Sequence, residues 1–287
     1  MRVFSSFVFS FFIAFFANAQ LPAAYNLFDS EGNEVPFDEF LNRVMECDVF
    51  FFGELHNDPV AHWFRLKLAR AVYENGGKEM KFGAEMFELD NQLLLDEFQA
   101  GLISERNFEQ EMRLWKNHKT DYKPIFDWSR ELGIPWYATN VPRRYANLVH
   151  REGIAALERL PEESRRYLPE LPVEVDMNLE TYAALLEMMP AGHGGDNFVA
   201  AQAIKDAAMG YTIARVLESG QLMIHLNGAY HNKKNEGILW YLEKYRPGLQ
   251  LITLSTVLQA DVSQLTDENR GISDFILVVD ESMTKTY

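Results

Sequence analysis

The stretch VFFFGELHNDP, residues 49–59, decides the fold. Four consecutive apolar residues before a glycine are typical of a strand that is buried on both faces. Asp58 and Pro59 then predict the start of a helix, as its N-cap and first-turn residues, and apolar side chains recur every four residues from Val60 to Val72. The stretch KFGAEM, residues 81–86, follows as a second strand. A strand-helix-strand unit of this kind indicates a parallel sheet.

The rest of the chain extends this pattern. We expect helices over about 91–131, a third strand at 134–139, and a helix over about 235–245. No convincing strand lies between about 143 and 220, so this stretch predicts a helical cap inserted before the fourth strand. Further strands are predicted at 222–226, 249–254 and 275–279. The expected fold is therefore α/β, with a mostly parallel central sheet flanked by helices, in a single domain over 20–287.

The first 19 residues are predicted to be a signal peptide. Arg2 precedes an apolar run over 3–16, and the small residues Ala17-Asn18-Ala19 follow as a cleavage site. The alternative is a retained membrane anchor, although the run is shorter than the roughly 20 residues that span a bilayer. Gln20 stands where a lipoprotein would need a cysteine. We therefore expect an exported protein, soluble after cleavage, in the periplasm or cell envelope.

Charge and cysteine content narrow the possible partners. The chain carries 27 basic and 42 acidic residues, for a net charge of -15. Such a balance repels phosphate backbones, so nucleic acid is not an expected partner. Cys47 is the sole cysteine and cannot form an internal disulfide. An exported chain of this composition has to rely on its hydrophobic core for stability.

Two copies of a Gly-x-x-His element follow predicted strands, at 53–56 and at 228–231. Ligands of open parallel sheets bind at the carboxyl ends of the strands, so His56, His231 and Glu85 are expected to share one cleft. Imidazole and carboxylate groups are metal ligands and general bases, which makes these three the candidate metal-binding or catalytic residues. The alternatives are hydrogen-bonded loop histidines and a glutamate that caps the next helix.

A second set of residues could hold a flat apolar cofactor. His193 lies in the loop MMPAGHGG, residues 188–195, where adaptable methionines adjoin an imidazole that could be an axial ligand to iron. Tyr230 lies inside the second Gly-x-x-His element, and Arg143 and Arg144 follow the third strand, where they could pair with propionates. The alternatives are an ordinary linker between two helices and solvated helix charges.

The remaining histidines are expected to be structural. His62, His118 and His150 lie on amphipathic helical patterns and are predicted to be on the surface. His225 alternates within a predicted strand and is expected to be a hydrogen-bonded core histidine.

The order of these pieces resembles the ChaN-like haem-binding uptake family, in a wider group with the Tiki proteases, the TraB proteins and the erythromycin esterases. The resemblance runs from about residue 49 to 254. It is carried by FGELHNDP at 52–59, GAEMF at 83–87, NVPR at 140–143, the stretch with Gln202, Asp206, Ala207 and Met209, and GAYH at 228–231.

The resemblance implies an α/β sheet with a helical cap and a role in haem or iron uptake, with haem as cofactor. It suggests tyrosine ligation of the haem iron, although no short motif identifies the tyrosine. In the wider group, the two histidines and the glutamate form a metal or hydrolytic site, so a hydrolase using His56, Glu85 and His231, with or without a divalent transition metal, is the alternative function. Whether the chain is an enzyme is left open, as are a homodimer and an outer-membrane haem receptor as partners.

Overall fold

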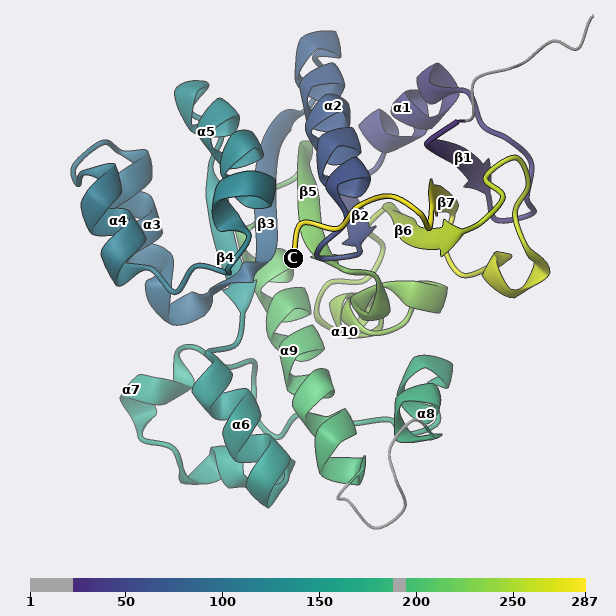
Figure 1. The fold of residues 1–287 in the computed structure, drawn as a ribbon. Coiled ribbons are helices and arrows are strands. Elements are labelled where there is room, and N and C mark those ends of the chain that lie inside the picture. The colour runs from purple at the N-terminus through teal and green to yellow at the C-terminus, as the bar shows by residue number, and fades with distance from the viewer. Residues whose placement is uncertain (1–22, 188–194) are drawn as a thin grey trace, which may run out of the picture.

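Seven strands form one sheet at the centre of the molecule (Figure 1). The structure is a computed structural model, which describes residues 23–187 and 195–287. The strands are β1 (Tyr25–Asp29), β2 (Val49–Glu54), β3 (Glu79–Glu88), β4 (Trp136–Asn140), β5 (Gln221–Gly228), β6 (Leu251–Gln259) and β7 (Phe275–Asp280). Their order across the sheet is β1-β7-β6-β2-β5-β3-β4.

Only β1 runs antiparallel to its neighbour, and every other pair is parallel. This arrangement confirms the predicted α/β fold with a mostly parallel sheet. The edge strand β1 was not predicted. At their C-terminal ends the strands β3, β5 and β6 continue beyond the predicted bounds, and polar residues there, Glu88, Asn227 and Thr256, are buried.

Ten α-helices surround the sheet in the described part of the chain. They are α1 (Phe37–Glu46), α2 (Pro59–Asn75), α3 (Gln92–Gln99), α4 (Glu105–Glu111), α5 (Lys123–Glu131), α6 (Arg143–Glu152), α7 (Glu162–Arg165), α8 (Glu180–Glu187), α9 (Gly195–Val216) and α10 (Ile238–Tyr245). A π-helical turn, His118–Tyr122, precedes α5, and a 3-10 turn, Ala229–His231, follows β5. The helical stretch predicted over 91–131 is therefore divided into separate short helices.

The apolar run of β2 is explained by burial on both faces of the sheet. Phe50 and Phe52 pack into a core with α1 to α5, whereas Val49 and Phe51 pack on the opposite side against α9 and α10. Parallel strands covered by helices on both faces read as continuous apolar sequence, because neither face meets water. This core fixes β2 at the middle of the sheet.

The helical insertion lies between β4 and β5. In the described residues of this stretch, 141–187 and 195–220, there is no strand. The helices α6, α8 and α9 share a smaller hydrophobic core, which includes Tyr145, Tyr182 and Ile204. In Figure 1 these helices lie on one side of the sheet, below the ends of its central strands. The helical insertion therefore lies before β5 and near the strand ends, which is the position predicted for the cap.

The predicted signal peptide, residues 1–19, lies outside the described residues. Among the helices within 23–187 and 195–287, none is both long and apolar enough to cross a membrane.

Candidate functional site

The two Gly-x-x-His elements leave neighbouring strands at the same level. In the sheet register, Gly53 pairs with Asn227 and Glu54 pairs with Gly228. The strand β3 lies on the other side of β5, with Ala84 paired to Leu226, so Glu85 stands one residue further toward the same end. The two Gly-x-x-His elements and Glu85 therefore lie at the same end of the sheet, as predicted.

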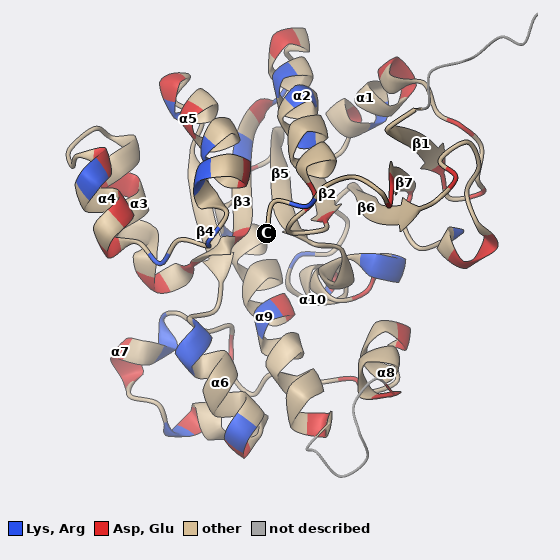
Figure 2. Cartoon of the chain, viewed as in Figure 1, with Lys and Arg blue, Asp and Glu red and all other residues tan. Residues whose placement is uncertain are grey.

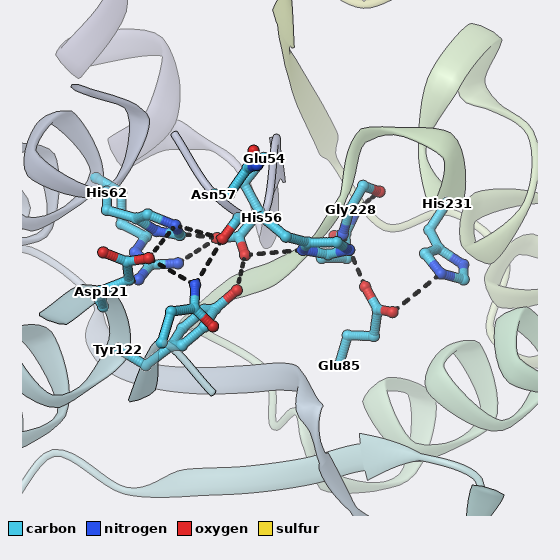
Figure 3. Close-up of polar contacts among 12 residues, drawn as sticks. Glu54, His56, Asn57, His62, Glu85, Asp121, Tyr122, Gly228 and His231 are labelled. Carbon is cyan, nitrogen blue, oxygen red and sulfur yellow. Dashed lines mark hydrogen bonds and ion pairs between the residues drawn. The ribbon is translucent and has the colours of Figure 1, made fainter. Parts of the chain in front are cut away.

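Glu85 links the two elements (Figure 3). Its Oε2 atom accepts a hydrogen bond of 2.7 Å from the backbone N–H of Gly228, and its Oε1 atom lies 3.2 Å from Nε2 of His231. The other ring nitrogen of His231, Nδ1, pairs with the carboxylate of Asp206 on α9. Asp206 in turn accepts a hydrogen bond of 2.7 Å from the hydroxyl group of Tyr182. A buried polar chain thus runs from the sheet into the helical insertion.

His56 faces the same place from β2. Its side chain is 35% exposed, and Nδ1 lies 3.1 Å from Oε1 of Glu54. A Cβ atom at Gly228 would lie 2.8 Å from Nε2 of His56 and 3.6 Å from Oε2 of Glu85. Glycine at position 228 leaves room for the imidazole ring of His56, because a Cβ atom there would require that ring to shift.

Behind His56, Glu54 is the centre of a buried cluster of polar side chains (Figure 3). It pairs with Arg65 of α2, and both side chains are fully buried. It also accepts a hydrogen bond of 2.5 Å from the hydroxyl group of Tyr122 and lies 3.6 Å from Nδ1 of His62. This cluster fixes the carboxylate that holds His56, and it is joined to α2, whose N-cap Asp58 accepts from Ala61 N–H as predicted.

The surface positions predicted for two histidines are wrong. His62 is buried because it faces Glu54 and hydrogen-bonds through Nε2 with the backbone oxygen of His56 at 3.0 Å. His118, in the π-helical turn before α5, is buried because it lies beside the rings of Phe108 and Phe126. His150 is exposed, as expected. His225 is a buried core histidine, also as expected, and hydrogen-bonds with Thr139 and Asn227.

The cluster around Glu54 sets the charges beside His56. Burial by itself would raise the pKa of Glu54, but the positive charge of Arg65 and the neighbouring histidines lower it to about 2. Burial would lower the pKa of His56, but the hydrogen bond to Glu54 and the charge of Glu85 raise it above its usual value. His56 is therefore held by a carboxylate that stays ionised at every physiological pH.

His231 is held between two carboxylates. Burial would lower its pKa, but Glu85 and Asp206 raise it to about 10, so the ring is an imidazolium ion at neutral pH. Burial would raise the pKa of Glu85, and His231 and His56 lower it instead. An imidazolium ion has no free lone pair, and a carboxylate of lowered pKa is a weak base.

This electrostatic arrangement does not favour the alternative of a hydrolase or metal site. Glu85, the group expected to activate water, is already engaged by Gly228 and His231. Within residues 23–187 and 195–287, no group of three or more His, Cys, Asp or Glu side chains is arranged to hold a metal ion.

A pocket of about 630 Å³ opens at this end of the sheet. We call it the strand-end pocket. His56, Glu85 and His231 lie along its wall, with Gly228 between them. The rest of the lining includes the apolar side chains of Leu185, Val257 and Leu258 and the polar side chains of Gln202, Lys205, Tyr230, Lys233 and Glu268. Tyr230 is 48% exposed, and the ammonium group of Lys233 lies 5.4 Å from the centre of its ring.

The other predicted cofactor residues lie elsewhere. Arg143 pairs with Glu88 and Arg144 with Asp90, beyond the end of β4, and neither arginine lines the strand-end pocket. Glu88 also accepts a hydrogen bond of 3.0 Å from the backbone N–H of Arg143, at the start of α6. His193 lies outside the described residues.

Several residues of the site, charged ones among them, were not among the predicted site residues. Lys205 and Asp206 come from α9, and Lys233 follows the second Gly-x-x-His element. Asp206 had two available signals. It belongs to a stretch that carries the family resemblance, and it is four residues after Gln202, so both lie on one face of α9. The amide of Gln202 also contacts His231 at 3.0 Å. The two lysines carry no pattern that separates them from surface lysines.

Comparisons with known proteins bear on the family and the fold. A family model described as "Haem-binding uptake, Tiki superfamily, ChaN" matches residues 40–242. The solved structure of ChaN of Campylobacter jejuni, described as showing cofacial haem binding, is similar with a TM-score of 0.68 and 15% identity, over 89% of this chain and 97% of that one. At this identity the likeness concerns the fold.

Two other solved structures are more distant. The type III effector HopBA1 has a TM-score of 0.46 and 13% identity, over 85% of this chain and 92% of that one. The effector domain RRSP of a MARTX toxin from Vibrio vulnificus has a TM-score of 0.44 and 16% identity, over 86% of this chain and 38% of that one. No curated protein gives a significant match to the sequence.

Proposed function

Because the chain belongs to the haem-binding uptake family of ChaN in the Tiki superfamily, we propose that it binds haem in the strand-end pocket and acts in haem or iron uptake. The observation that carries this proposal is the composition of the pocket, which joins apolar walls to an exposed phenol and two lysines. Its volume of about 630 Å³ is in the range of roughly 300–1,000 Å³ typical of cofactor sites.

The lining residues suit the parts of a haem molecule. Leu185, Val257 and Leu258 offer apolar surface to the porphyrin. Lys205 and Lys233 offer ammonium groups to the two propionates, and no ion pair within the described residues occupies either lysine. Such ion pairs would orient the cofactor with its carboxylates toward α9 and the turn after β5.

Tyr230 is the residue that we assign to the iron. Phenolate is an established axial ligand of haem iron, and the Tyr230 side chain is half exposed at the wall of the pocket. His231 cannot take this role while both of its ring nitrogens are engaged by carboxylates. When bound, haem would be the cargo that the protein stores or transfers, together with its iron. The chain's own residues would bind and orient the haem.

Export to the periplasm or cell envelope is part of the same proposal. It rests on the apolar segment and the small residues of the first 19 positions. An exported haem carrier would meet haem outside the cytoplasm, where an outer-membrane receptor would deliver it. Cell fractionation with an antibody to the chain tests this part separately.

The test of haem binding is a titration of the purified protein with hemin, followed by the Soret band. We expect saturation near one haem per chain at micromolar hemin. Tyr230→Phe should shift the Soret band and weaken binding, and a Lys205→Gln, Lys233→Gln double variant should weaken binding with an unchanged band. Tyr73→Phe is the matched control, because Tyr73 is 46% exposed and lies on α2. Absence of any spectral change with the unmodified protein would refute the proposal.

A further inference from the structure

A second pocket lies beside the edge strand β4. We call it the edge pocket. It has a volume of about 310 Å³ and lies between β4, the last turns of α9 and the segment that follows α7. Its apolar lining includes Leu89, Leu168 and Val216. None of its lining residues belongs to the strand-end pocket, and it has about half the volume.

Two arginines line the edge pocket and have no acidic partner in the part of the chain that the structure describes. Arg166 and Arg215 form no ion pair with any residue in 23–187 or 195–287, and no acidic side chain is among the described residues that line this pocket. The chain has 42 acidic residues, and Figure 2 shows acidic and basic residues on most of its helices. By contrast, the nearby Arg143 and Arg144 both pair with carboxylates.

Aromatic rings hold these two arginines in place. The guanidinium carbon of Arg215 lies 5.3 Å from the ring centre of Tyr211, and that of Arg166 lies 4.8 Å from the ring centre of Tyr167. Stacking of a guanidinium group on a ring leaves its N–H donors at the edge free for another acceptor. The arginines are therefore positioned without being neutralised.

A buried lysine adds a third positive charge beneath the pocket. Lys81 of β3 is 4% exposed and has no carboxylate partner in the described part of the chain. Its ammonium group donates to the backbone oxygen of Val216 at 3.1 Å and lies 5.5 Å from the ring of Tyr137. Val216 and Tyr137 both line the edge pocket. A buried ammonium group paired with a backbone oxygen rather than a carboxylate is costly, so its position beside a pocket with two arginines that lack an acidic partner among the described residues favours an anion bound from outside.

We propose that the edge pocket binds a small organic anion. Its carboxylate or phosphate group pairs with Arg166 and Arg215, and its apolar body lies against Leu89, Leu168 and Val216. Guanidinium groups recognise both kinds of oxyanion through paired N–H donors. This ligand is distinct from haem, and the inference does not depend on haem binding in the strand-end pocket.

Isothermal titration with three probes of one shape tests the proposal: benzoate, phenyl phosphate and neutral benzamide. We expect benzoate or phenyl phosphate to bind and benzamide not to bind, and the preferred anion identifies the head group. The double variant Arg166→Gln, Arg215→Gln should weaken binding by about ten- to a hundredfold, because it removes charge-assisted hydrogen bonds. Saturation with hemin should leave the affinity for the anion unchanged.

The matched control is Arg43→Gln, Arg106→Gln, which removes the same charge from two exposed arginines outside the edge pocket. It should keep the affinity of the unmodified protein. Both double variants alter exposed side chains, so thermal unfolding followed by circular dichroism should show folded protein in each case. Equal affinity in the two double variants would overturn the proposal, as would failure of both anions to bind at millimolar concentration.

Discussion

Replacing Glu54 with glutamine should destabilise the protein strongly, because the substitution leaves a buried guanidinium group without its charge partner. The side chains of Glu54 and Arg65 are both fully buried. Removing one partner of such a pair typically costs about 3–5 kcal/mol, since the remaining charge stays in a medium of low polarity. The hydrogen bond from Tyr122 can still be made to the amide oxygen, so we expect a loss near the lower end of this range.

The free energy of unfolding is measured by urea denaturation at pH 7. Glu74→Gln is the control, because Glu74 is an exposed residue of α2, and it should change stability by less than about 0.5 kcal/mol. A double variant, Glu54→Gln with Arg65→Met, should be more stable than Glu54→Gln alone, because it removes the unpaired charge. It also keeps the reasoning testable if the single variant does not fold.

The same pair has a pH signature. The pKa of Glu54 is about 2 in the folded chain and 4.5 in its reference state, so its contribution to stability is present above pH 4.5 and is lost as the pH falls toward 2. The double variant should lose less stability in this range than the unmodified protein. A Glu54→Gln loss below about 1 kcal/mol, or an unchanged acid profile, would refute this account of the cluster.

Two further predictions concern His231 and Gly228, which both line the strand-end pocket. His231 has a pKa of about 10, above its reference value of 6.5, so its contribution to stability is complete below pH 6.5 and is lost as the pH rises toward 10. Urea denaturation from pH 7 to 10 should show this loss as a falling free energy of unfolding. The Asp206→Asn variant should show a smaller fall over the same range. Gly228→Ala places a Cβ atom 2.8 Å from Nε2 of His56, so it should displace that ring and weaken hemin binding by about tenfold, or 1.4 kcal/mol. NMR of the His56 imidazole and a Soret titration measure the second effect, and unchanged spectra with unchanged affinity would contradict it.

The central strands and the site could be predicted because their signals are local. The run of apolar residues at 49–52 is continuous since both faces of β2 are covered, and the glycine that ends it precedes His56 at a fixed spacing. Parallel neighbours then bring Glu85 and His231 to the same end without further information. The family resemblance added the expectation of haem.

The missed features depend on contacts between distant parts of the chain. The strand β1 has only five residues, and it is defined by pairing with β7, about 250 positions later. Likewise, His62 is buried because Glu54 lies behind it, which an amphipathic helical pattern does not reveal. The periodicity of a sequence predicts which face of a helix is apolar, but it does not predict which polar residue on that helix lies against a buried charge.

The short strands at the two borders of the sheet have a consequence for how copies of the chain can associate. Both β1 and β4 have five residues, and each has a sheet partner on one side only. A short border strand offers few unpaired backbone groups to another chain, which limits fibril formation and continuous sheets that run from copy to copy. Any dimer should therefore be built from side chains on the helices, and its interface should be sensitive to surface substitutions rather than to changes in backbone pairing.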